Sequence, residues 1–221
     1  MQKKFISFEG GEGSGKTTTA KGLFEYLVNE DIPAVFTRDP GGTKIGDRIR
    51  DILLPTEYSE IAATTEFLLY QASRAQLLSE IIKPALEQDK VVITDRFIDS
   101  TVAYQGWGRG HPLATQKQLE TMGLVDEIPG LTFLLQVDPK VGLTRSLQRQ
   151  QDSDINEDRF EKESMDFHKR VYDGYTYLAK RNPSRIVTLD TTYLTQLQVF
   201  NQIKSIFLTM YWGETDSGKG S

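Results

Sequence analysis

The chain has 221 residues, which is enough for one α/β domain with a sizeable hydrophobic core. Its hydrophobic fraction of 38% and charged fraction of 26% are those of an ordinary soluble globular protein. A net charge of −5 disfavours a general nucleic-acid-binding surface, and the lack of cysteine excludes disulfides, thiol nucleophiles and cysteine-ligated zinc.

The hydropathy pattern predicts neither export nor membrane insertion. The apolar run near the N-terminus is too short for the core of a signal peptide, and no segment reaches the length of a membrane span. A chain without cysteine also suits a reducing compartment. We therefore expect a cytoplasmic protein that works without a membrane or a nucleic-acid partner.

The first predicted strand, residues 5–9, leads directly into a glycine-rich segment with the pattern GxxxxGK[ST]. Its glycines allow a tight turn whose backbone N–H groups point inward, which favours bound phosphate at the start of the next helix. In such a loop Lys16 reaches the β- and γ-phosphates and the Thr17 hydroxyl ligates Mg²⁺. The sequence therefore predicts a nucleoside triphosphate site formed by Gly10, Gly11, Glu12, Gly13, Ser14, Gly15, Lys16, Thr17 and Thr18.

The rest of the chain alternates predicted helices and strands. Helical spacing of apolar residues predicts helices at 16–29, 45–54, 65–88 and 100–105, with a kink or break at Pro84. Apolar and β-branched runs predict further strands at 33–37, 90–95, 131–137 and 185–189, with helices between and after the last two. Glycine and proline predict loops at 38–42 and 106–112. This alternation favours a five-stranded parallel sheet covered on both faces, with ligands at the carboxyl ends of the strands.

Asp95 ends the strand predicted at 90–95. An acid at this place is either an ordinary turn residue or, in phosphate-loop proteins, a group that holds Mg²⁺ or its bound water. We expect Asp95 and Thr17 to form the metal site.

Five motifs occur in order along the chain: residues 8–18, 37–42, 72–74, 95–100 and 103–106. Together they closely resemble the thymidylate kinase family of the bacterial type, and the resemblance extends from residue 3 to about residue 208. It implies the nucleoside-monophosphate-kinase version of the P-loop NTPase fold, with a mobile lid. We accordingly expect one kinase domain over residues 1–212, a lid at about 145–160, and a polar tail at 213–221.

The activity implied by this resemblance is phosphoryl transfer from MgATP to dTMP, giving dTDP and ADP, a step in dTTP synthesis. Mg²⁺ would be the cofactor, ATP and dTMP the small-molecule partners, and a homodimer the oligomeric state. The alternatives are a related kinase of another pyrimidine nucleotide or deoxynucleoside and, in a different class, a nucleotide-dependent binding switch. The chain lacks the Asn-Lys-x-Asp guanine motif of regulatory GTPases, and its acidic balance disfavours a nucleic-acid-dependent ATPase.

The acceptor phosphate requires fixed cations, and planar guanidinium groups bind phosphate at two points. Arg96 and Arg50 match the positions that the family uses for this purpose. Arg48 is a rival to Arg50, and Arg38, at the end of the second strand, is a weaker candidate. A surface ion pair is the alternative role for Arg96 and Arg50.

Base selection is expected on the long helix. Tyr70 and Arg74 are four residues apart, so on a helix they share one face, where the ring stacks on thymine and the guanidinium donates to a base carbonyl. The family usually has Phe at the Tyr70 position, and core packing is the alternative role for this ring. Further residues matched to the dTMP site are Asp39, in place of the usual Glu, Ser100, Thr101, Gln105 at the pyrimidine edge, and Tyr104 near the sugar 2′ position.

A kinase also needs positive charge over the transferred phosphoryl group and must exclude water. The phosphate loop has no arginine, so the resemblance implies that lid arginines assist catalysis, with Arg149 and Arg159 the best matches and Arg145 flanking adenine. Glu12 matches an acid that contacts the 3′-hydroxyl region of the acceptor, or its bound Mg²⁺ and water. The catalytic set is therefore Lys16, Arg96, Arg149 and Glu12.

Overall fold

The computed structural model describes residues 4–58, 60–112, 114, 118, 127–151 and 159–212. The central part of the expected lid, residues 152–158, and the expected tail, residues 213–221, lie outside the described residues. Within the described part of the chain, no helix is both long and apolar enough to cross a membrane.

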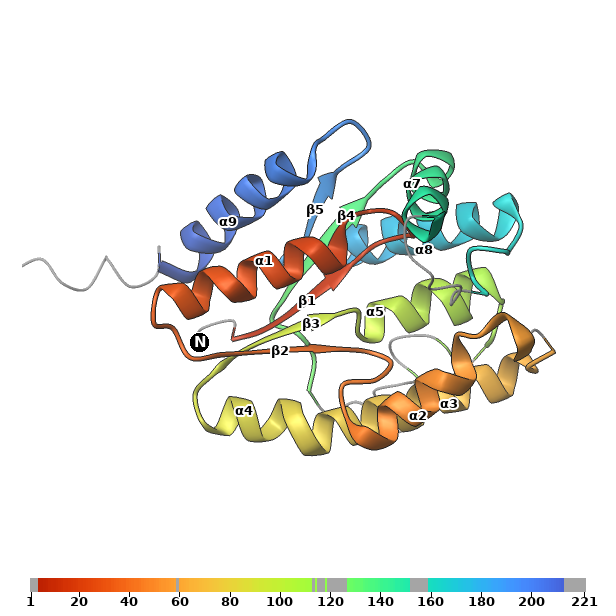
Figure 1. Ribbon diagram of the computed structural model, residues 1–221, viewed down its shortest axis with the longest axis horizontal. Coiled ribbons are helices and arrows are strands. Elements are labelled where there is room, and N and C mark those ends of the chain that lie inside the picture. The colour runs from red at the N-terminus through yellow and green to blue at the C-terminus, as the bar shows by residue number, and fades with distance from the viewer. Residues whose placement is uncertain are drawn as a thin grey trace, which may run out of the picture.

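A five-stranded parallel sheet runs through the molecule (Figure 1). Its strands are β1 (Phe5–Glu9), β2 (Ala34–Arg38), β3 (Val91–Asp95), β4 (Leu131–Gln136) and β5 (Ile186–Asp190). The order across the sheet is β2-β3-β1-β4-β5, with Ile6 of β1 paired to Ile93 on one side and to Leu131 on the other. The five predicted strands are confirmed, and their ends agree with the prediction to within one residue.

Helices connect the strands, and polar side chains cap the first turns of several of them. The helices are α1 (Lys16–Asn29), α2 (Lys44–Leu53), α3 (Ala63–Leu77), α4 (Lys83–Glu87), α5 (Ile98–Thr101), α7 (Pro139–Gln151), α8 (Met165–Arg181) and α9 (Gln196–Trp212), with a 3₁₀ turn η1 (Thr56–Tyr58) and π-helical segments η2 (Leu78–Ile82) and η3 (Val102–Gly108). Thr43 caps α2 by accepting the Gly46 N–H at 2.9 Å, and Ser164 caps α8 by accepting the Phe167 N–H at 3.2 Å.

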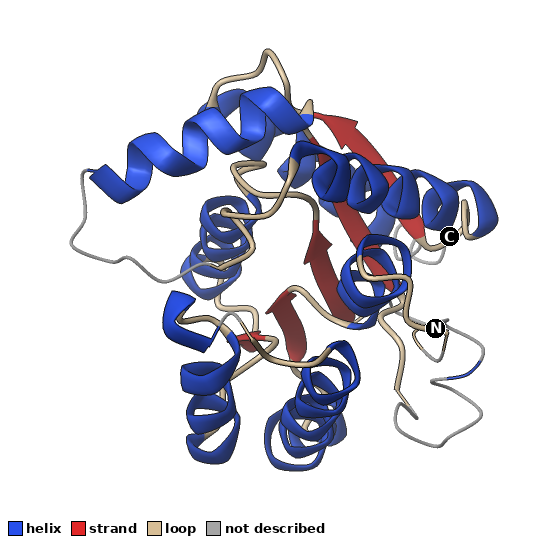
Figure 2. Cartoon of the chain, turned by 90° about the vertical axis from the view of Figure 1, so that its right-hand side faces the viewer, coloured by secondary structure: helices blue, strands red, loops and turns tan. Residues whose placement is uncertain are grey.

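Alternate strand residues face two hydrophobic clusters on opposite faces of the sheet. Ile6 and Phe8 belong to the cluster formed with α1 and α9, whereas Phe5 belongs to the cluster formed with α3 and α8. Figure 1 shows α1 and α9 along the same face, and Figure 2 shows helices on both sides of the strands. The predicted α/β architecture, with a sheet covered on both faces, is confirmed.

The helical regions differ from the prediction in two places. The chain stays helical from residue 63 to 87: a wide π turn, η2, precedes Pro84, which lies in the first turn of α4, where a missing N–H is tolerated. The predicted loop at 106–112 was wrong at its start, because η3 continues through Gly108. Gly108 lies against Phe167 of α8, where a Cβ would come within 2.6 Å of the ring. That glycine therefore serves helix packing rather than a turn.

Candidate active site

The phosphate loop joins β1 to α1 at the carboxyl edge of the sheet. Gly10 has φ +147° and Gly13 has φ +65°, conformations that favour glycine. A Cβ at Gly10 would collide with the backbone oxygen of Leu135, and one at Gly13 with that of Gly142. These two glycines therefore allow the loop to lie directly against β4 and α7.

Lys16 begins α1 and is 8% exposed. Its ammonium donates to the Gly11 carbonyl oxygen at 3.3 Å and lies 3.8 Å from a carboxylate oxygen of Glu12. The lysine is thus held over its own loop. Lys16 and Thr17 line a cleft of about 470 Å³ together with Arg96 and Arg149.

Thr17 and Asp95 meet at this cleft, as the sequence predicts. The Thr17 hydroxyl donates to Asp95 Oδ2 at 2.5 Å, and Asp95 Oδ1 is buried without a hydrogen-bond partner in the described part of the chain. A hydroxyl beside a carboxylate with an unused oxygen suits Mg²⁺, which prefers oxygen ligands and takes one or two carboxylates together with substrate phosphates. The residues present therefore fit the expected cation.

Arg96 joins the loop to the acceptor side of the site. Its Nη2 donates to Glu12 Oε1 at 2.7 Å and to the Tyr104 hydroxyl at 3.1 Å, and its Nη1 donates to the Gly10 carbonyl at 3.0 Å. The residue has φ +67°, an uncommon conformation for a side-chain-bearing residue, and follows directly after β3. The backbone at the strand end thus turns the guanidinium back over the phosphate loop.

Glu12 lies among these cations and does not face solvent. Burial alone would raise the pKa of its carboxyl, but Lys16 and Arg96 lower it to about 2. The Tyr104 hydroxyl donates to Glu12 Oε1 at 2.7 Å. Glu12 is therefore ionised, and it balances two cations that face the cleft.

A second, smaller cavity of about 50 Å³ adjoins the cleft. Its lining comprises Glu12, Pro40, Arg50, Leu54, Tyr70, Arg96, Ser100, Tyr104, Gln105 and Phe160. Three of these residues, Glu12, Arg50 and Arg96, also line the phosphate-loop cleft. One cavity, which adjoins the phosphate-loop cleft, therefore contains six of the expected acceptor residues: Arg50, Tyr70, Arg96, Ser100, Tyr104 and Gln105.

The structure also separates Arg50 from its rival. Arg50 donates to the Pro40 carbonyl at 3.0 Å and lines both cavities, whereas the Arg48 side chain is 83% exposed and paired with Asp51. Arg38, the weaker candidate, lines the cleft and lies 3.1 Å from Asp47.

Two predicted acceptor residues, Arg74 and Thr101, lie behind the cavity wall in an internal network with Asp39. Arg74 is 1% exposed and donates to Asp39 Oδ2 at 2.6 Å and to the Thr101 hydroxyl at 2.7 Å. Burial raises the pKa of Asp39, and the opposite charge of Arg74 offsets part of that rise. Asp39 lines the cleft, but neither Arg74 nor Thr101 is among the residues that line either cavity. Contact between Arg74 and a bound base stays a prediction.

The three arginines expected at the lid occupy different environments. Arg149 of α7 lines the cleft, and its side chain is 66% exposed. Arg145 of α7 donates to the carbonyls of Thr191 and Thr192 at 3.1 and 2.8 Å, beside the outer side of the phosphate loop. Arg159 is 6% exposed, with its Nε bonded to the Leu53 carbonyl at 2.7 Å. Arg149 therefore reaches the cleft, whereas Arg159 anchors the chain to α2.

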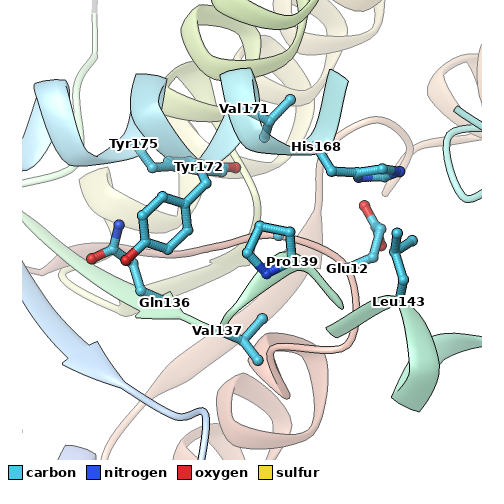
Figure 3. A pocket seen from close by; sticks show the side chains of 10 residues that line it. Glu12, Gln136, Val137, Pro139, Leu143, His168, Val171, Tyr172 and Tyr175 are labelled. Atoms are coloured by element: carbon cyan, nitrogen blue, oxygen red, sulfur yellow. The ribbon is translucent and has the colours of Figure 1, made fainter. Parts of the chain in front are cut away.

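A small cavity of about 20 Å³ lies behind the phosphate loop, between α8 and the β4–α7 connection (Figure 3). In Figure 3 the His168 ring lies over the Glu12 carboxylate. Burial lowers the pKa of His168, and its Nε2 is buried without a hydrogen-bond partner in the described ranges. At neutral pH the positive charges beside Glu12 are therefore those of Lys16 and Arg96.

Sequence reasoning assigned no role to Glu9, the last residue of β1. Its carboxylate accepts hydrogen bonds from the Ser100 hydroxyl at 2.6 Å, the Phe97 N–H at 2.8 Å and the Tyr175 hydroxyl at 3.0 Å. Glu9 thus holds the Ser100 side chain, which lines the acceptor cavity, by a hydrogen bond. The only signal in the sequence was an acid at the end of a mostly apolar strand, directly before the glycine-rich loop.

Glu9 should give the protein a characteristic pH dependence. Burial and the nearby Asp99 raise its pKa from 4.5 to about 7. Between these values the folded state binds more protons than the unfolded state, so the free energy of unfolding falls as pH rises, by up to about 1.4 kcal/mol per pH unit. This contribution is complete below the unfolded pKa and lost above the folded one. We expect Glu9→Gln to abolish this component in urea unfolding between about pH 5 and pH 8; parallel profiles would contradict the assignment.

Known proteins are similar to this chain over most of its length. The family model described as thymidylate kinase matches residues 8–203. A thymidylate kinase of Dehalococcoides mccartyi is 42% identical over 200 residues, covering 90% of this chain and 93% of the relative. Another, of Geotalea uraniireducens, is 46% identical over 187 residues, covering 84% and 88%.

A solved structure is also similar along most of the chain. The crystal structure of thymidylate kinase from Ehrlichia chaffeensis has a TM-score of 0.72 and 34% identity, covering 93% of this chain and 98% of that one. The phosphate loop, the adjoining acceptor cavity and these likenesses lead to one conclusion. The chain belongs to the thymidylate kinase family.

Proposed function

We propose that this protein transfers the γ-phosphoryl group of MgATP to dTMP, giving dTDP and ADP. The proposal rests on the wall that the two cavities share. Glu12, Arg50 and Arg96 line both the phosphate-loop cleft and the cavity that contains Tyr70 and Gln105. A donor phosphate chain and an acceptor monophosphate can therefore meet end to end at these three residues.

The acceptor's phosphate fits between Arg50 and Arg96, whose guanidinium groups can each bind phosphate at two points. An oxygen of that phosphate is already anionic, so no protein group has to remove a proton before attack. Positioning and charge compensation then account for most of the catalysis. Lys16 and Arg149, which face the same cleft, supply positive charge where negative charge gathers on the transferred group.

Mg²⁺ fits at Thr17 and Asp95 and would, when bound, offset charge on the ATP phosphates. These two residues orient the cation side of the site, and Asp95 also pairs with Phe8 of β1 in the sheet register. The hydroxyl and the carboxylate are therefore held by rigid elements on either side of the loop.

The base and sugar of dTMP fit the smaller cavity. Tyr70 of α3 is 9% exposed and offers its ring for stacking, and Gln105 of η3 offers an amide for the pyrimidine edge. The Tyr104 hydroxyl is held between Glu12 and Arg96, so its ring is fixed beside the expected sugar. A fixed ring excludes an added 2′-hydroxyl by filling its space.

We also propose that the protein acts as a homodimer in the cytoplasm. Apolar side chains of α2 and α3 support an interface between copies, because Ile45, Ile52 and Leu68 are 53%, 43% and 52% exposed. Exposed apolar side chains on two helices that pack against each other can provide a surface for another protein.

A coupled ADP-release assay with MgATP tests the proposed activity. The acceptors are dTMP, dUMP, ribothymidine monophosphate, dCMP, AMP and GMP, run in parallel. We expect a strong preference for dTMP, with the 2′-hydroxyl analogue rejected because of Tyr104, and only modest discrimination against dUMP because one methyl group is worth about 1–3 kcal/mol. Turnover of AMP or GMP in preference to dTMP would contradict the proposal.

A further inference from the structure

Glu66 is a buried acid on α3 that borders the acceptor cavity without lining it. It is 1% exposed, and one of its oxygens, Oε1, accepts a hydrogen bond from Gln105 Nε2 at 2.8 Å. It lies four residues before Tyr70, so both side chains project from the same face of the helix. Among the described residues, Gln105 is the cavity-lining residue that hydrogen-bonds to Glu66.

Two arginines hold Glu66 in place. Arg159 Nη2 lies 2.7 Å from Glu66 Oε2, and Arg109 Nη2 lies 3.4 Å from the same oxygen. Both guanidinium groups also lie over the Phe160 ring, with their carbons 4.7 and 5.5 Å from its centroid. Because a buried carboxylate requires compensating charge, this pair keeps an acceptor-only group at the position that Gln105 meets.

The carboxylate decides which way the Gln105 amide is turned. An ionised carboxylate can only accept, so Gln105 must present its NH₂ group to Glu66. The amide oxygen of Gln105, Oε1, is then directed to the cavity. Among the described residues, the bond to Glu66 is the one hydrogen bond that the Gln105 amide makes.

We propose that Glu66 is a specificity-determining residue that acts through Gln105. With Oε1 directed to the cavity, Gln105 accepts a hydrogen bond from the N3–H of thymine. Cytosine has a lone pair at N3 and would leave two acceptors facing each other, an unsatisfied and repulsive contact. This inference rests on the proposed function, since it concerns the base of the dTMP acceptor.

The test compares dTMP with 5-methyl-dCMP, which keeps the methyl group, the sugar and the phosphate and differs only at N3 and C4. In Glu66→Gln the new amide can donate to Gln105, so the Gln105 amide is free to turn. We expect the ratio of kcat/KM for dTMP over 5-methyl-dCMP to fall by about tenfold or more. The ratio for dTMP over dUMP and the KM for ATP should stay unchanged, because neither depends on N3.

Glu66→Asp provides a second variant for the case in which loss of the charge prevents folding. It keeps the charge for Arg109 and Arg159 but withdraws the carboxylate from Gln105, so the same ratio should fall. The matched control is Glu163→Gln, because Glu163 pairs with Arg109 at 2.6 Å but not with Gln105 in the described part of the chain. That variant should keep the ratio of the unmodified protein.

A double-mutant cycle separates positioning from general damage to the fold. If Glu66 acts through Gln105, adding Glu66→Gln to Gln105→Ala should leave the base ratio where Gln105→Ala alone puts it. Equal losses for dTMP and 5-methyl-dCMP in the folded Glu66 variants, or additive effects in the cycle, would overturn the inference. Absence of dTMP turnover in the unmodified protein would instead contradict the proposed function.

Discussion

Lys16→Ala is expected to lower kcat about 100- to 1,000-fold while leaving the protein folded. The lysine lines the phosphate-loop cleft at the start of α1. A fixed cation there stabilises the negative charge that develops on the transferred phosphoryl group. Its loss should not unfold the protein, because Glu12 keeps its 2.7 Å bonds from Arg96 and Tyr104. Steady-state kinetics with MgATP and dTMP, together with circular dichroism and thermal melting, measure both parts.

A lysine on a neighbouring helix supplies the control. Lys204 of α9 lies over the Tyr26 ring, with its nitrogen 3.7 Å from the ring centroid. Lys204→Ala should retain the kcat of the unmodified protein. A Lys16→Ala variant that is folded and turns over at a near-normal rate would show that the phosphate loop does not serve catalysis as argued.

Arg96→Lys is expected to lower kcat/KM for dTMP by about 100-fold or more, with a much smaller change in the KM for ATP. The guanidinium reaches the Gly10 carbonyl, Glu12 and Tyr104 from two nitrogens at once. A lysine offers the same charge from one atom and cannot span these groups. The acceptor's phosphate would then meet a cation that is neither planar nor fixed.

Arg48→Lys is the matched control, since that side chain is 83% exposed and paired only at the surface with Asp51. Exposed ion pairs contribute little, so its kinetic constants should stay within about twofold. If Arg96→Lys raised the requirements for ATP and dTMP equally, the placement of Arg96 on the acceptor side would be wrong.

The sequence predicts the strands and the phosphate loop well because both depend on local chemistry. Apolar β-branched runs indicate buried strands, and the glycines at 10 and 13 allow a backbone path that other residues would block. Asp95 could be placed beside Thr17 for the same reason, since parallel strands bring their carboxyl ends to one edge.

The remaining parts of the site depend on contacts that are distant in sequence. Glu66 meets Gln105 across 39 positions and Arg159 across 93, and no spacing rule connects them. Arg74 carries the expected helical spacing from Tyr70, yet its partners Asp39 and Thr101 come from other segments and hold it behind the cavity wall. Helical periodicity indicates which face a side chain takes, but not which polar group it finds there.

A label-transfer experiment follows the transferred phosphoryl group itself. The protein is incubated with dTMP, Mg²⁺ and ATP labelled with ³²P at the γ position, and the products are separated by chromatography. We predict that the label appears in dTDP in a one-to-one ratio with ADP, and that Lys16→Ala slows the formation of both products about 100- to 1,000-fold. Label found in inorganic phosphate, with dTMP unchanged, would contradict this prediction.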